Sequence, residues 1–146
     1  MYIKKFEKKS EKKVFLGGTC AESTWREDLI EKLEIDYFNP VVDDWTEDAQ
    51  KEEIKQRETC DFCLYVITPR MKGVYSIAEV VDDSNKRPEK TVFCYLKEDD
   101  SDDKKEDKLT FTKDQLKSLE QVGKLVSDNG AKFCKTLNDV AKFLNE

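Results

Sequence analysis

Apolar residues along the chain gather in short runs, and longer segments rich in charged residues separate them. Short, mostly apolar runs are typical of buried strands. We expect strands at residues 14–18, 35–38, 62–68, 91–96 and 131–134. The run at 62–68 reads FCLYVIT, and its unbroken apolar character predicts a central strand that is covered on both faces.

The segments between these runs carry helical patterns. Residues 23–33 predict an amphipathic helix that begins with a capping box between Thr24 and Glu27, and Trp25 lies on its apolar face. We expect further helices at residues 47–59, 77–85, 112–130 and 137–145. The segment 97–107, KEDDSDDKKED, is interpreted as a mobile acidic loop.

The helix expected at 47–59 differs from the others. Ile54 is almost its only large apolar residue, and acidic and basic side chains are mixed along it. A helix with so little apolar surface must face solvent or a wet cleft on at least one side.

The alternation of strands and helices predicts a three-layer α/β domain of the flavodoxin-like or Rossmann-like kind. Its parallel sheet would hold about five strands in the order 2-1-3-4-5, with right-handed crossovers. We expect a basic N-terminal extension at 1–13 and a single domain at 14–146. In such sheets ligands bind where the strand order reverses, so function is expected in the loops that follow residues 17 and 68.

Composition excludes several classes of function. The net charge of −6 argues against binding of polymeric nucleic acid, which needs clustered Lys and Arg. We find no apolar stretch long enough to span a membrane and no signal peptide, so the expected location is the cytoplasm. The five cysteines are an odd number and are expected to be reduced. The C-x-x-C pair of Cys60 and Cys63 has no histidine to complete a zinc site, so no metal is predicted.

Two glycine-containing loops are candidate ligand sites. Gly17 and Gly18 end the first strand and either approach a ligand or simply form a tight turn. Gly73 lies in the loop that leads from the third strand to Glu79. With Ser76 as N-cap, Glu79 would complete a capping box and need no chemistry. The alternative is an ionised carboxylate in the first helical turn, which could act as a nucleophile towards a sugar carbon. Spacing alone leaves both interpretations open.

Three stretches carry a resemblance to a known family: VFLGGTCAESTWRE, FNPVVDDW and ETCDFCLYVITPRMKGVYSIAEVVDDS. Their order and spacing, over about residues 14 to 96, resemble the nucleoside 2-deoxyribosyltransferase-like family. The resemblance implies a flavodoxin-like fold and cleavage of the N-glycosidic bond of a deoxynucleoside or its nucleotide. It also implies that a glutamate attacks the sugar and passes it to a second base or to water, without a cofactor.

Under this resemblance Glu79 takes the place of the nucleophile. The implied substrate-binding residues are Gly17, Gly18, Thr19, Asn39, Asp43, Asp44 and Trp45. Gly73, in the loop before Glu79, and Trp25 are further substrate-binding candidates. Glu53 and Glu58 lie on the helix where relatives place an acid that protonates or orients the base, although a solvated charged face is the alternative there. Trp25 and Trp45 could stack on a base, but Trp25 also fits the core.

The sequence departs from the family pattern at Phe15, where relatives carry a tyrosine that can donate a hydrogen bond to the glutamate. Val80 and Val81 follow the glutamate where relatives often have Leu-Gly. These differences keep open a non-catalytic nucleotide-binding or interaction module. Analogy of fold alone adds a glycohydrolase acting on a NAD or ADP-ribose nucleotide. The expected partner is a small nucleoside or nucleotide, and a homodimer is possible.

Overall fold

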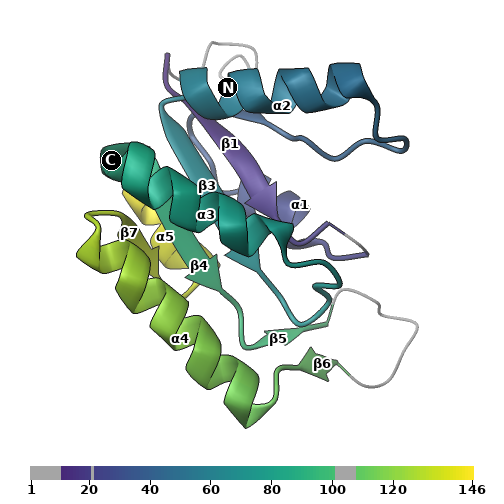
Figure 1. The fold of residues 1–146 in the computed structure, drawn as a ribbon, viewed down its shortest axis with the longest axis vertical. Coiled ribbons are helices and arrows are strands. Elements are labelled where there is room, and N and C mark those ends of the chain that lie inside the picture. The colour runs from purple at the N-terminus through teal and green to yellow at the C-terminus, as the bar shows by residue number, and fades with distance from the viewer. Residues whose placement is uncertain (1–10, 21, 101–107) are drawn as a thin grey trace, which may run out of the picture.

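The computed structural model describes residues 11–20, 22–100 and 108–146, and Figure 1 shows the fold. The strands of the main sheet are β1 (Lys13–Gly18), β2 (Asp36–Phe38), β3 (Phe62–Ile67), β4 (Thr91–Tyr95) and β7 (Lys132–Cys134). The helices are α1 (Trp25–Ile30), α2 (Glu47–Thr59), α3 (Tyr75–Lys86), α4 (Lys113–Asp128) and α5 (Leu137–Asn145). A short 3₁₀ turn (Pro88–Lys90) leads into β4.

The main sheet is parallel and has the order β2-β1-β3-β4-β7. This order confirms the predicted fold class, with β7 as the expected fifth strand. The register pairs Gly17 with Tyr65 and Gly18 with Val66, so the ends of β1 and β3 lie side by side. The strand order reverses at β1, because β2 continues on its other side.

Helices cover both faces of the sheet (Figure 1). On one face Leu29 of α1 and Leu144 of α5 pack against alternate side chains of the central strands, including Leu64. On the other face Val80 of α3 and Leu119 of α4 pack against the remaining set, including Tyr65. Five of the six β3 residues are buried, which confirms the prediction of a central strand covered on both faces.

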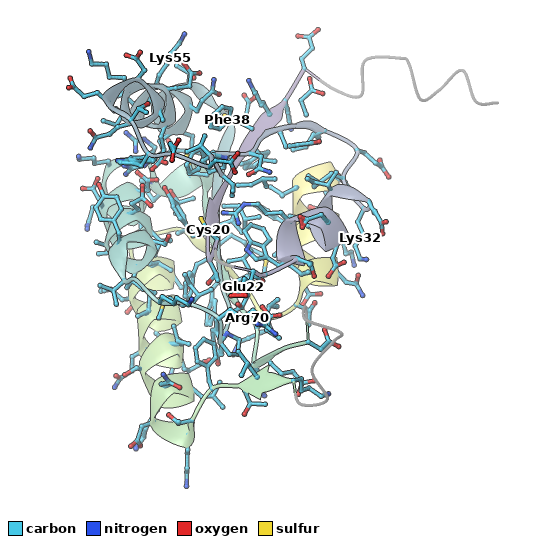
Figure 2. All side chains as sticks on the ribbon, turned by 90° about the vertical axis from the view of Figure 1, so that its right-hand side faces the viewer. Cys20, Glu22, Lys32, Phe38, Lys55 and Arg70 are labelled. Carbon is cyan, nitrogen blue, oxygen red and sulfur yellow. The ribbon has the colours of Figure 1, made fainter. Side chains whose placement is uncertain are left out.

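Helix α2 lies beside α3 and has no buried residue. It begins at the position expected, with the Thr46 hydroxyl accepting a hydrogen bond from the Ala49 amide. The side chain of Ile54 is 47% exposed. Figure 2 shows Lys55 on the outer side of this helix, with Phe38 of β2 and Cys20 below it. The prediction of a polar helix facing solvent or a cleft is confirmed.

Three local predictions need correction. Helix α1 ends at Ile30, before the expected residue 33, and its N-cap Thr24 makes no side-chain capping hydrogen bond. Strand β1 begins at Lys13, so the last residue of the expected extension belongs to the sheet, and residues 1–10 lie outside the described residues.

None of the helices in the described part of the chain is long and apolar enough to cross a membrane.

The segment expected to be a mobile acidic loop contains structured residues. Strand β5 (Glu98–Asp99) pairs antiparallel with β6 (Leu109–Thr110). The buried Asp99 carboxylate accepts hydrogen bonds from Ser23 and from Arg70, at 2.7 and 3.2 Å. It thereby links the loops that follow β1 and β3. The remainder of the segment, 101–107, lies outside the described residues.

Candidate functional site

A cavity of about 520 Å³ opens at the carboxyl end of β1, between α2 and α3. This volume is in the usual range for small-molecule sites. Its lining residues are Phe15, Gly17, Gly18, Cys20, Arg26, Pro40, Trp45, Gln50, Glu53, Tyr75, Ser76 and Glu79. The cavity lies where the strand order reverses, which is the position that the predicted fold assigned to a ligand.

The glycines at the end of β1 allow the chain to pass very close to β3. Gly18 has φ +117°, and a Cβ atom there would lie 2.1 Å from the Val66 carbonyl oxygen. A Cβ atom on Gly17 would lie 2.7 Å from the Tyr65 ring. Thr19 then returns to β3, because its amide donates to the Val66 carbonyl and its hydroxyl accepts from the Thr68 amide. Gly17 and Gly18 therefore shape the floor of the cavity by packing as well as lining it.

Helix α1 fixes this loop through a buried arginine. Arg26 is 3% exposed, and its guanidinium donates to the carbonyls of Leu16 and Thr19 at 3.0 and 2.6 Å. Trp25 donates from Nε1 to the same Thr19 carbonyl at 2.8 Å. The Trp25 ring is buried in the core, stacks with the Arg26 guanidinium and does not line the cavity. Its position supports the core interpretation and not stacking on a base.

Glu79 lies in the second turn of α3 and not at its start. The helix has Val74 as N-cap and no side-chain capping hydrogen bond, so Ser76 is already the second helical residue. The predicted capping box between Ser76 and Glu79 is therefore wrong. Glu79 is 6% exposed, and among the described residues its Oε2 atom has no hydrogen-bond partner. A buried polar atom with no partner is costly in a folded protein, so this carboxyl group is a candidate ligand-binding group.

The protonation of Glu79 also differs from expectation. The pKa of this carboxyl is raised to about 8, mainly by burial and in addition by a hydrogen bond with the Glu53 carboxyl and by the charge of Glu53. The charge of Arg57 opposes the shift. We expected the helix dipole to keep Glu79 ionised, but desolvation and a like charge outweigh the dipole in the second turn. The raised pKa therefore favours the protonated form of Glu79 at neutral pH.

Glu53 and Glu58 lie on different sides of α2. Glu53 is half-buried and lines the cavity together with Gln50, one helical turn before it. Glu58 is exposed and does not line the cavity. Only Glu53, of these two, is within reach of Glu79.

Arg57, one turn after Glu53, joins α2 to α3. Its Nε and Nη2 atoms donate to the two oxygens of Asp83 at 3.3 and 2.8 Å, and its Nη1 atom lies 3.5 Å from Glu79 Oε2. Burial alone would lower the pKa of Arg57, but the hydrogen bonds and charge of Asp83 raise it well above its ordinary value. The guanidinium is therefore charged at every accessible pH.

The sequence matches the family described as nucleoside 2-deoxyribosyltransferase like over residues 11–99, more than half of the chain. The chain belongs to this family. The match confirms the resemblance seen over residues 14–96. No curated protein matches the sequence.

The other residues predicted from the family pattern fall into three groups. Trp45 lines the cavity and is 57% exposed. Thr19 and Gly73 instead line a smaller hollow of about 230 Å³, which adjoins the cavity at Gly18. The residues that line neither space are Trp25, Asn39, Asp43, Asp44 and Glu58. Asn39 has a local role, since its side-chain oxygen accepts a hydrogen bond from the Val41 amide.

Phe15 lies at the position where the family resemblance implies a tyrosine. Its ring lines the cavity and contacts the rings of Phe38 and Tyr65, each with centroids 6.0 Å apart. The Tyr65 hydroxyl is directed elsewhere, because it donates to Asp83 at 2.5 Å. The substitution therefore leaves Glu79 without a phenol donor from this part of the sheet.

Sequence reasoning missed Arg26, Gln50 and Arg57. Charged residues make up 40% of the chain, so single charges on a helix carry little information. A usable signal was the spacing of Gln50, Glu53 and Arg57, which places all three on one face of a helix that has almost no apolar residues. A polar face with regular spacing indicates a helix that faces a wet cleft.

Proposed function

We propose that the protein cleaves the N-glycosidic bond of a 2′-deoxynucleoside or its nucleotide and transfers the deoxyribose to another base or to water. The supporting observation is the Glu79 carboxyl group, buried beside a cavity in a member of this family, with one oxygen free of hydrogen bonds among the described residues. Glu53 supplies a second carboxyl group in hydrogen-bond contact with it.

The proton held between the two carboxyl groups accounts for the first half of the reaction. When it moves to Glu53, Glu79 becomes a carboxylate and Glu53 becomes the acid. A Glu79 oxygen then attacks C1′ of the sugar while the bond from C1′ to the base nitrogen breaks. Glu53 gives its proton to the departing nitrogen, so the base leaves neutral and the sugar remains as an ester of Glu79.

The second half reverses these roles. A water molecule or an incoming base gives a proton to Glu53 and forms a new bond to C1′. The ester bond breaks, and its electron pair returns to Glu79 as a carboxylate. The pair again holds one proton, so protein carboxyl groups supply both the nucleophile and the acid, and the scheme needs no cofactor.

The lining of the cavity fits a nucleoside. Trp45 and Tyr75 are exposed aromatic side chains at its rim, and aromatic rings stack on bases of any sequence. The Gln50 amide can both donate to and accept from a base edge. Gly17 and Gly18 present bare backbone at the floor, where a sugar can approach closely.

Trapping of the intermediate gives the sharpest test. A 2-fluoro-2-deoxynucleoside slows breakdown of the ester, so intact-protein and peptide mass spectrometry will show the added sugar on Glu79. Glu79→Gln will abolish the adduct, while the control Glu58→Gln will keep it.

Deoxynucleosides and deoxynucleotides incubated with a foreign base will give exchanged or free base by chromatography. A protein that yields neither product nor adduct with any of these substrates does not have the proposed activity.

A non-catalytic nucleotide-binding module is the second candidate. Phe15 in place of a tyrosine and the retained proton on Glu79 favour it, because both weaken the nucleophile. In that case titration calorimetry will show saturable nucleotide binding without turnover. Glu79→Gln will then leave the affinity nearly unchanged.

The cellular location, the oligomeric state and the absence of nucleic-acid binding are also part of the proposal. We expect it in the cytoplasm, where the five free cysteines stay reduced. We expect a homodimer and no binding of polymeric nucleic acid. Exposed apolar side chains on β2, on α2 and in the segment between them support the dimer, namely Tyr37, Val41, Trp45 and Ile54. Sedimentation equilibrium measures it directly.

A further inference from the structure

The Arg57 guanidinium is held in a fixed direction by the carboxylate of Asp83. Two of its nitrogens, Nε and Nη2, donate to the two Asp83 oxygens. A paired contact of this kind fixes the plane of the guanidinium as well as its position. The third nitrogen, Nη1, is then directed towards Glu79.

Asp83 is itself fixed from several sides. It is fully buried, and it accepts hydrogen bonds from the Tyr65 hydroxyl and from Arg87, one helical turn later. Burial and the Asp83 charge raise the pKa of Tyr65 well above its ordinary value, so the phenol stays a donor. The contact with Asp83 that fixes Arg57 therefore does not depend on the protonation of the carboxyl groups that face the cavity.

The distance from Arg57 to Glu79 is informative. At 3.5 Å, Nη1 is close enough to attract a charged oxygen strongly, but Glu79 Oε2 has no hydrogen bond in the described part of the chain. A neutral carboxylic acid gains little from a cation at this distance, whereas a carboxylate gains much. Arg57 thus favours the carboxylate form of Glu79, which burial disfavours.

We propose that Arg57 is a positioning residue, which stabilises Glu79 as a carboxylate when its proton has moved to Glu53, and again when the sugar ester breaks. This proposal rests on the proposed glycosidic activity for its catalytic part. Its electrostatic part concerns the free protein and can be measured without turnover.

The charges that face Glu79 come from three sides. Glu53 and Arg57 belong to α2, Asp83 lies one turn later on α3, and the neutral Tyr65 phenol belongs to β3. Arg26 of α1 also lines the cavity, but its guanidinium is bound to carbonyls of the β1 loop. Arg57 is thus the cation whose contact with Glu79 the structure records.

Arg87 provides a matched control for Arg57. Both arginines bind Asp83, and both are partly buried, but the structure records a contact with Glu79 only for Arg57. Arg57→Gln and Arg87→Gln each remove one cation from Asp83, so a purely structural role predicts similar effects. Arg57→Lys keeps the charge while losing the paired geometry.

The catalytic part is tested by steady-state kinetics of the folded variants. We expect Arg57→Gln to lower kcat by roughly tenfold with KM nearly unchanged, and to move both limbs of the pH profile up by about one pH unit. Arg57→Lys will recover part of kcat, and Arg87→Gln will leave the profile in place. Equal pH profiles for Arg57→Gln and Arg87→Gln would overturn the proposal.

The electrostatic part is tested by NMR titration of Glu79 in protein labelled with ¹³C at glutamate, with Glu79→Gln to assign the signal. We expect its pKa to rise in Arg57→Gln and to stay in place in Arg87→Gln. A protein without any turnover but with this shift would disprove the glycosidic function and keep the electrostatic role. An unchanged titration in Arg57→Gln would reject the role itself.

Discussion

Helix α4 buries Leu119 and Val126 against the sheet, whereas helix α2 buries no side chain and contacts α3 through Arg57. Helix α4 also begins with a complete capping box between Thr112 and Gln115. At Gly123, where a Cβ atom would lie 2.2 Å from the Phe133 ring, it approaches β7 closely. These features of α4 start the helix and pack it against the sheet.

The face of α2 that meets α3 carries ionisable groups instead. Glu53 and Arg57 lie one turn apart and both reach Glu79. Apolar contacts would hold this helix at a lower cost in free energy, because buried ion pairs add little net stability. The difference teaches that α4 stabilises the fold through apolar packing, whereas α2 presents charged groups to Glu79 at the cavity. Four predictions test this division, from the largest expected effect to the smallest.

Glu53→Gln is expected to have the largest effect. It removes the proposed acid for the departing base, so turnover will fall by roughly 10²–10⁴-fold in a standard initial-rate assay. Glu58→Gln, on the exposed side of the same helix, will keep turnover within about twofold. If the two variants lose activity equally, α2 acts as a whole and its cavity face has no separate role.

Asp83→Ala breaks the contact between α2 and α3. It leaves Arg57 and Arg87 without their shared carboxylate, so the free energy of unfolding in urea will fall by about 3–5 kcal/mol. The neighbouring Asp82, which is 44% exposed at its side chain, provides the control. Asp82→Ala will change stability by about 0.5 kcal/mol or less. A small effect of Asp83→Ala would mean that α2 is held by something other than this ion pair.

Stability will also depend on pH through Glu79. The pKa of this carboxyl is about 8 in the folded protein and near 4.5 when unfolded, so the folded state binds the extra proton between these values. The free energy of unfolding therefore falls as pH rises from about 4.5 to 8, by something on the order of a few kcal/mol. Urea titrations across this range will show the slope, and Glu79→Gln will flatten it. Parallel curves for the two proteins would contradict the raised pKa.

A pair of alanine substitutions compares the two helices directly. Leu119→Ala on α4 removes a buried side chain and will cost about 2–3 kcal/mol of unfolding free energy, with turnover per folded molecule unchanged. Ile54→Ala on α2 removes an exposed one and will cost about 0.5 kcal/mol or less. Equal costs would show that α2 is packed more firmly than its exposure indicates.

Much of the fold was predictable because strand-length apolar runs report burial directly. The strand order, the central position of β3 and the polar character of α2 all follow from that pattern. The first residue of α3 could not be predicted from the pattern, because a capping box adds only about 1 kcal/mol of stability. The packing of Val80 and Ile77 against the sheet decides where the helix begins instead.

The candidate site was only partly predictable from the sequence. Glu79 stood out as a single acid in an apolar run, and the cavity lies beside it. Its partners Arg57 and Asp83 come from segments in which charges are common, and no local pattern separates a buried ion pair from a solvated one. Their contact depends on how α2 and α3 pack, which is a long-range property of the fold.

The close passage of β1 past β3 at Gly18 has a consequence for evolution. A side chain at this position would overlap the backbone of Val66, whereas a side chain at Gly73 would meet open space. Selection for folding alone is enough to keep glycine at 18, in relatives with or without catalytic activity. We therefore expect drift among descendants of this protein to change residue 73 freely and to leave residue 18 as it is.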